Sequence, residues 1–213
     1  MTNALIITGT DTGIGKTIFA AGLTGALQAR YWKPVQSGLE EETDSQIVAR
    51  LTGCETLPEA YRLHLPASPH LSAEAEGTTI DPARLTLPAA TGPLVVEGAG
   101  GLMVPLNRQM LMIDLFARWQ VPVILCARTA LGTINHSLLS LAALRQSGCP
   151  ILGITFIGPA NPAVEQTICD FGQVAHLGTL PILPELTPAA LAVAFATNID
   201  LATIRKGLGL DPA

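Results

Sequence analysis

Short apolar runs rich in β-branched residues alternate along this chain with longer, proline-free stretches of small and apolar residues. Runs of the first kind are typical of buried strands, and stretches of the second kind are typical of helices. The predicted strands cover residues 4–8, 31–35, 94–97, 121–127, 150–157 and 176–180. The predicted helices cover residues 16–29, 44–51, 110–119, 133–147, 162–172 and 188–197. Strands that alternate with helices of this length favour right-handed βαβ units around a parallel sheet.

One region departs from this alternation. Residues 55–90 carry five prolines among mixed residues, and we expect loops and a short helix there. The chain has no internal repeat, low-complexity tract or linker. We therefore expect one domain over residues 1–213. Its fold class would be α/β, with a mostly parallel open sheet and helices on both faces.

The composition limits which residue types can form the core. Apolar residues make up 48% of the chain and charged residues 14%, which is too apolar for disorder. Aromatic residues make up only 4%, so Ala, Leu, Ile and Val must build the interior, as in parallel sheets covered by helices. The net charge of −5, without a basic run, argues against nucleic acid as a partner.

The cysteines and the lengths of the apolar runs indicate the cellular compartment of the protein. The four cysteines, Cys54, Cys126, Cys149 and Cys169, form no close pair and no metal-ligand spacing. We interpret them as reduced thiols of a cytoplasmic protein. No apolar run approaches the roughly 20 residues that span a bilayer, and no signal-peptide pattern opens the chain, so no membrane partner is expected.

The first candidate for chemistry is the sequence GTDTGIGKT at residues 9–17, between a predicted strand and a predicted helix. Glycines let backbone N–H groups turn inward, and the helix N-terminus attracts anions, so this context is typical of a phosphate-binding loop. Lys16 would reach the β- and γ-phosphates, and the Thr17 hydroxyl could ligate Mg²⁺. The spacing is unusual, because Gly9 lies one residue too early and Thr10 stands where glycine is expected. The alternative is a glycine-rich turn that contains Gly-Lys-Thr by chance.

Two acidic residues are candidates for the metal. Glu97 ends an apolar strand and precedes Gly-Ala-Gly-Gly, at the edge where a parallel sheet carries its ligands. Asp44 stands near the start of a predicted helix, where it could equally be an N-cap. A capping role remains the alternative for Glu97 too.

Two further turns could face the same crevice. Lys33 and Ser37 belong to KPVQSG, which overlaps the end of the second predicted strand and continues into the turn after it, although a solvated lysine in an ordinary turn is the alternative. The helix that begins near Thr133, within GTINH, offers free N–H groups that suit a carboxylate, although a plain helix start capped by Thr133 or Asn135 is equally open. The sequence leaves open whether His70 or His136 contacts a substrate.

Four motifs, taken together, point to one protein family. GTDTxxGKT, KPVxSG, VEGAGG and LGTINH occur in order across residues 9–136 and resemble the dethiobiotin synthetase family, a branch of the P-loop NTPase-like fold. The resemblance implies a homodimer that uses Mg²⁺ and ATP, or another nucleoside triphosphate. It implies that 7,8-diaminononanoate and CO₂ or bicarbonate become dethiobiotin, through a carbamate and a carbamic–phosphoric anhydride.

The resemblance also implies roles for residues. The triphosphate would be held by Thr12, Gly13, Ile14, Gly15, Lys16 and Thr17. The base side would be formed by Ile157, Gly158 and Pro181. The metal set would be Thr17, Asp44 and Glu97, and the catalytic set would be Lys33, Lys16 and Ser37. The substrate would be bound by Ser37, Gly100, Thr133, Ile134 and Asn135, the last three from across the dimer.

The chain differs from the family at a position that contacts the nucleotide base. Many members carry an adenine-reading Asn after the strand at residues 150–157, and here Ile157 occupies that place, while Asn161 comes several residues later. An apolar side chain cannot pair with a base edge, so we expect relaxed base selectivity, read by backbone groups around residues 157–161. Comparing the affinities for ATP, CTP and GTP tests this, and a strong preference for ATP would contradict it.

Three rival functions remain. A partition- or septum-positioning ATPase shares the loop type, but that branch typically has a lysine where this chain has Asp11. An amide-forming ligase of cobalamin-type synthesis shares the fold, but usually carries a glutaminase domain for which this chain is too short. The third is a nonenzymatic nucleotide-binding module.

Overall fold

The computed structural model describes residues 3–89 and 91–210, and a seven-stranded sheet forms its centre. The strand order is β4-β2-β6-β1-β7-β8-β9, and every neighbouring pair runs parallel. The strands are β1 (Ala4–Gly9), β2 (Arg30–Trp32), β4 (Thr56–Leu57), β6 (Leu94–Glu97), β7 (Val123–Arg128), β8 (Ile151–Ile157) and β9 (His176–Leu180). A second, two-stranded parallel sheet pairs β3 (Val35–Ser37) with β5 (Tyr61–Leu63). The parallel α/β fold class is therefore confirmed.

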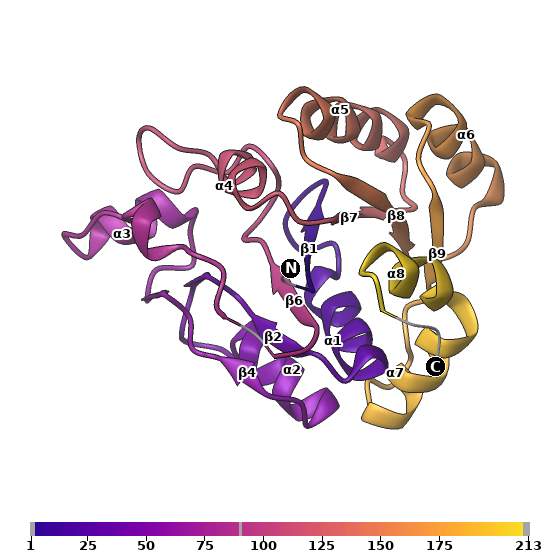
Figure 1. The fold of residues 1–213 in the computed structure, drawn as a ribbon, viewed down its shortest axis with the longest axis horizontal. Helices are drawn as coiled ribbons and strands as arrows, with labels where there is room; N and C mark the ends of the chain where they lie inside the picture. Colours follow the sequence, from indigo (N-terminus) through magenta and orange to yellow (C-terminus); the bar gives the residue numbers. More distant parts are fainter. Residues whose placement is uncertain (1–2, 90, 211–213) are drawn as a thin grey trace.

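Helices cover both faces of the large sheet (Figure 1). They are α1 (Lys16–Leu27), α2 (Asp44–Thr52), α3 (Pro69–Ala75), α4 (Met112–Trp119), α5 (Thr133–Gln146), α6 (Pro162–Gly172), α7 (Pro188–Asn198) and α8 (Leu201–Gly207), with a 3₁₀ turn at Pro82–Arg84. In the view of Figure 1, α4, α5 and α6 lie above the sheet, and α1, α2 and α7 lie below it. No helix in the described part of the chain is long and apolar enough to cross a membrane.

Alternation along the strands explains the two layers. In β1, Ala4 and Ile6 pack with the cluster that includes α4, whereas Leu5 and Ile7 pack with the cluster that includes α1, α7 and α8. Successive side chains of a strand point to opposite faces, so a strand covered on both sides is buried along its length and mainly apolar. All six residues of β1 are buried, as this requires.

Strand register brings the candidate site together. β1 is the central strand, between β6 and β7, and its Ile7 pairs with Glu97 at the end of β6. The loop that follows Gly9 therefore starts beside Glu97. Because all strands are parallel, the turns after β2, β8 and β9 lie along the same edge.

Two expectations about elements were wrong, and one helix was not predicted. The predicted strand at residues 31–35 is two strands in different sheets, because the chain turns at Lys33 and Pro34. The segment 55–90 contains the strands β4 and β5 besides its helix, and α8 follows the last predicted helix. The short strands depend on their partners rather than on a local pattern, which explains why the sequence does not reveal them.

Candidate active site

The phosphate loop joins β1 to α1. Gly13 and Gly15 adopt left-handed backbone conformations, with φ of 68° and 94°, that β-carbon-bearing residues rarely adopt. A Cβ atom on Gly9 would lie 2.5 Å from Cδ1 of Ile14, so the loop folds back closely on its own start. The Ile14 side chain is buried in the apolar core, which leaves only its backbone to face a ligand.

Lys16 opens α1 and is almost completely buried. Its Nζ donates to the backbone oxygen of Asp11 at 2.8 Å, within the loop itself. Burial lowers the pKa of Lys16, and the charge of Glu97 opposes that shift only in part. The buried ammonium therefore lacks full compensation, which an anionic phosphate can supply.

Glu97 is the centre of a buried polar network. The side chain is 1% exposed, and its Oε1 accepts from the Thr17 hydroxyl at 2.9 Å and from Nζ of Lys33 at 3.3 Å. Its Oε2 accepts from the hydroxyl of Tyr31 at 2.8 Å. These contacts are not those of a helix or turn cap, so the capping alternative for Glu97 is wrong.

Lys33 joins this network to Asp44. Its Nζ contacts both the Asp44 carboxylate and Glu97. Burial alone would lower the pKa of Lys33, but the two carboxylates outweigh it and raise the pKa above its usual value. Lys33 is therefore a buried ammonium, and the alternative of a solvated lysine is wrong.

Asp44 is not the cap of its helix. Thr43 caps α2 and forms a reciprocal capping box with Gln46, and Asp44 is the first helical residue. Its carboxylate is thus free to turn toward Lys33.

A cavity of about 470 Å³ begins at this network. Thr12 of the phosphate loop, Lys33, Ser37, Asp44 and Gly100 line it, so five of the predicted residues come together. The Ser37 hydroxyl is buried and has no hydrogen-bond partner among the residues that the structure describes. The rest of the lining is mainly small and apolar, from Val35, Pro66, Ala67, Ser68, Pro69, Ala99 and Val104, with Gln36 beside them.

The predicted base-side residues meet at the ends of β8 and β9. Ile157 pairs with Leu180, which places Pro181 next to Gly158. The Ile157 side chain reaches the phosphate loop, because a Cβ atom on Gly15 would lie 3.0 Å from its Cγ2.

The polar groups that follow Ile157 already form hydrogen bonds within the protein. The backbone N–H of Gly158 donates to Leu180, and that of Asn161 donates to Glu165. The side chain of Asn161 caps α6. Asn161 therefore has a structural role, and these two N–H groups are not free to read a base.

The predicted carboxylate cradle lies apart from the cavity. Gly132, with φ of 94°, precedes α5, and no side chain caps this helix. Thr133, Ile134 and Asn135 do not line the 470 Å³ cavity, whereas Thr133 and His136 line a smaller one with Asp11, Arg128 and Leu131. The side-chain caps considered for Thr133 and Asn135 are absent.

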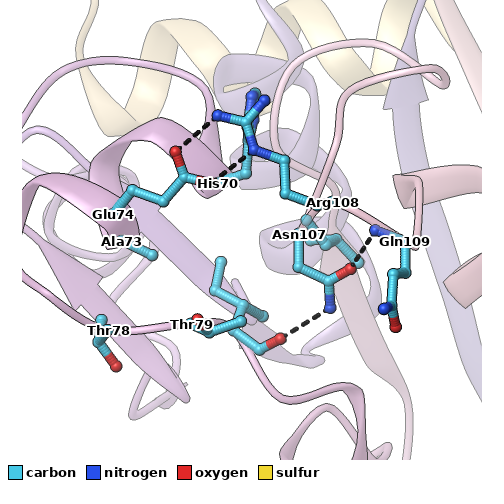
Figure 2. A pocket seen from close by; sticks show the side chains of 10 residues that line it. His70, Ala73, Glu74, Thr78, Thr79, Asn107, Arg108 and Gln109 are labelled. Atoms are coloured by element: carbon cyan, nitrogen blue, oxygen red, sulfur yellow. Dashed lines mark hydrogen bonds and ion pairs between the residues drawn. The ribbon is translucent and has the colours of Figure 1, made fainter.

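His70 also lies outside the main cavity. It lines a separate pocket of about 290 Å³ between α3 and the segment before α4 (Figure 2). An ion pair between Glu74 and Arg108 crosses this pocket. The Nδ1 of His70 lies 3.1 Å from the Ser68 hydroxyl.

Sequence reasoning missed Tyr31 and the segment at residues 66–69. Tyr31 sits in an apolar strand, where an aromatic residue predicts only core packing. The proline-rich segment predicts only loops and a short helix, and it gives no sign that residues 66–69 fold over the turn after β3. Only the pairing of β3 with β5 brings it there.

Comparison with known proteins narrows the choice among the rival functions. The model of a family described as AAA domain matches residues 3–190. The ATP-dependent dethiobiotin synthetase BioD of Agrobacterium fabrum is 63% identical over 205 residues, which cover 95% of this chain and 97% of that protein. The protein of the same name from Rhodopseudomonas palustris strain HaA2 is 58% identical and covers 100% of both chains.

Solved structures share the fold at much lower identity. The cell division ATPase MinD of Pyrococcus furiosus has a TM-score of 0.61 at 15% identity, covering 98% of this chain and 99% of its own. A ParA family ATPase from Chlorobium tepidum has a TM-score of 0.56 at 8% identity, covering 97% and 98%. Identities this low show a common architecture alone, whereas the relatives above are similar in sequence from end to end. The chain belongs to the ATP-dependent dethiobiotin synthetase family.

Proposed function

We propose that the 470 Å³ cavity is where this chain closes the ring of dethiobiotin, from 7,8-diaminononanoate, CO₂ and ATP. One observation supports the assignment to this cavity: Thr12 of the phosphate loop, the Lys33 ammonium and the Ser37 hydroxyl, which has no hydrogen-bond partner in the described chain, line the same space. The lining combines these polar groups with side chains that are mainly small and apolar. A substrate with two amines on an aliphatic chain suits such a lining.

The chemistry requires position and charge rather than a protein nucleophile. One amine of the substrate captures CO₂ as a carbamate. A carbamate oxygen attacks the γ-phosphorus, and ADP leaves, which gives a carbamic–phosphoric anhydride. The second amine attacks the carbonyl carbon, the bond to the phosphate oxygen breaks, and inorganic phosphate leaves as the urea ring closes. Lys16 and Lys33 would stabilise charge on the transferred phosphoryl group, and Ser37 would hydrogen-bond the carbamate.

We also propose Mg²⁺ as the cofactor. The donor set fits a hard cation, because Thr17, Asp44 and Glu97 offer one hydroxyl and two carboxylates. Within residues 3–89 and 91–210 no cluster of three or more His, Cys, Asp or Glu side chains is placed to hold a metal. Mg²⁺ usually binds through one or two carboxylates together with substrate phosphates, so a larger cluster is not required. When bound, the ion would neutralise charge on the phosphate oxygens.

A homodimer would complete the site. Leu131, Ile134, Leu139 and Met103 are exposed apolar side chains near the phosphate loop and α5. Within the described chain, the backbone N–H groups of Ile134 and Asn135 donate no hydrogen bond. Since these groups do not line their own cavity, we propose that they bind the substrate carboxylate in the partner's cavity.

We further propose a cytoplasmic location. All four cysteines are free, which suits a reducing compartment. Fractionation of cells that make the protein tests this, and recovery of the protein outside the cytoplasmic fraction would contradict it.

The activity is tested by mixing the protein with 7,8-diaminononanoate, bicarbonate, Mg²⁺ and ATP and measuring dethiobiotin by mass spectrometry. We expect dethiobiotin and ADP in equal amounts, and no product when the diamine is omitted. ATP hydrolysis that is independent of the diamine, without dethiobiotin, would refute the proposal and favour a nucleotide-dependent switch.

A further inference from the structure

Tyr31 is a buried side chain that touches the candidate site from behind. It lies on β2, is 0% exposed and packs in the apolar cluster beneath α1. Its hydroxyl donates to Oε2 of Glu97 at 2.8 Å. The other oxygen of the same carboxylate, Oε1, accepts from Thr17 and Lys33. The two oxygens of Glu97 are thus divided between the core and the site.

This division has a physical consequence. A glutamate side chain has three rotatable bonds, and its terminal torsion is broad, so only its hydrogen bonds fix the plane of the carboxylate. The Tyr31 ring is fully buried among close-packed core residues, which restrict its movement. Burial, followed by the charge of Glu97, raises the pKa of Tyr31 well above its usual value, so the hydroxyl keeps its proton and remains a donor.

We propose that Tyr31 is a positioning residue, which fixes Glu97 so that Oε1 faces Thr17 and the metal. This inference rests on the proposed function, because it assigns Glu97 to the metal set. Groups that orient a metal ligand through a hydrogen bond typically change metal affinity by about 10- to 100-fold when removed. Tyr31 differs from the ligands themselves, because its contact is with the inward-facing oxygen.

The competing explanation is that Tyr31 is an ordinary core residue whose hydroxyl simply needs a hydrogen-bond partner. The chain supplies a matched control for this explanation. Its other tyrosine, Tyr61, is also buried, and the Tyr61 hydroxyl accepts a hydrogen bond from the backbone of Asp81 at 2.9 Å. Tyr61 does not line the main cavity. Tyr31→Phe and Tyr61→Phe each remove one hydroxyl and one hydrogen bond, but only the first touches Glu97.

The experiment titrates Mg²⁺ into each purified protein with a fluorescent nonhydrolysable ATP analogue and records nucleotide binding, with thermal unfolding measured in parallel. We expect the Mg²⁺ concentration for half-maximal binding to rise about tenfold in Tyr31→Phe and to stay at the wild-type value in Tyr61→Phe. Both variants should unfold at somewhat lower temperature than wild type, because each loses a hydrogen bond of the folded chain.

An unchanged Mg²⁺ requirement in Tyr31→Phe would overturn the inference, and so would an equal rise in both variants. Dethiobiotin formation by the wild type is measured on the same preparation. A failure of the proposed function can therefore be distinguished from a failure of the proposed role of Tyr31. A wild type that makes dethiobiotin, with a Tyr31→Phe variant that needs no extra Mg²⁺, leaves the function standing and rejects only the role of Tyr31.

Discussion

Lys33 is a single side chain on which two distant parts of the chain converge. Its ammonium contacts Asp44, eleven residues later, and Glu97, sixty-four residues later. Removing one partner of a buried ion pair leaves the other charges uncompensated, which is far costlier than losing a surface pair. Lys33 therefore has two roles: it organises the carboxylates and offers a charge to the cavity.

Lys33→Ala should reduce dethiobiotin turnover by about 10²- to 10³-fold, the usual cost of removing one group that stabilises charge in the transition state. Nucleotide should still bind, because Lys16 and the loop backbone remain. Initial rates and analogue titrations measure the two effects. Lys206→Ala is the matched control, since Lys206 is an exposed lysine on α8. Unchanged turnover in Lys33→Ala would refute the role.

At the scale of residues, the sequence predicted which residues belong to the candidate site better than it predicted the contacts that they make. Glu97 could be singled out because it ends an apolar strand, and Lys33 and Ser37 because they belong to the KPVQSG motif. Asp44 could not be separated from a cap, because the choice depends on whether Thr43 forms the capping box. Tyr31 gave no signal, because its role comes only from the register that pairs β2 with β6.

At the scale of elements, the phosphate loop is held by a residue outside it. Arg128 ends β7, and its Nη2 lies 3.1 Å from Oδ2 of Asp11 and 3.3 Å from the backbone oxygen of Thr12. The other carboxylate oxygen of Asp11 accepts from the backbone N–H of Thr12 at 2.7 Å. The guanidinium thus bridges two consecutive loop residues, one of which lines the 470 Å³ cavity.

Arg128→Ala should weaken ATP binding by up to about fivefold at low salt, because an exposed ion pair contributes at most about 1 kcal/mol. The difference should shrink at high salt, where exposed charges are screened. Titrations at two ionic strengths measure both. Arg50→Ala is the control, since Arg50 forms a similarly exposed pair with Glu42 remote from the loop. Equal affinities of Arg128→Ala and wild type at low salt would contradict a role in holding the loop.

Elements were predictable where burial dictates their pattern. The central strands and long helices agree with expectation to within about two residues, because continuous apolar runs between turn residues leave little choice. The two- and three-residue strands β3, β4 and β5 carry no period of their own. Their existence depends on pairing, as β3 with β5 shows, and no local rule supplies that.

At the scale of the whole molecule, the separation of the α5 N-terminus from the cavity is the main argument for an assembly. If the N-terminus of α5 binds the substrate carboxylate, as proposed, a second copy must bring it to the proposed substrate site. The exposed side chain of Leu131, immediately before Gly132, would be covered in such an assembly.

Two inactive variants should therefore restore each other. Lys16→Ala damages the phosphate loop, and Asn135→Asp places a negative charge beside the cradle, where it repels a carboxylate. In a heterodimer one of the two sites combines an intact loop with an intact cradle, so mixing should recover part of the activity. Differently tagged chains and a dethiobiotin assay measure this, with Asn135→Ser as the neutral control. No recovery in verified heterodimers would show that each subunit works alone.

The strand order also has a consequence for synthesis on the ribosome. β1 and β2 are the first strands to emerge, yet they share no edge, because β6 lies between them. The pairing that seats the phosphate loop beside Glu97 therefore waits until residues 94–97 have left the exit tunnel. Until then β1 exposes a continuous apolar strand with both edges free, a state prone to aggregation. A nascent chain stalled just before Leu94 should thus be protease-sensitive and unable to retain nucleotide, whereas chains long enough to release β7 gain the central three strands together.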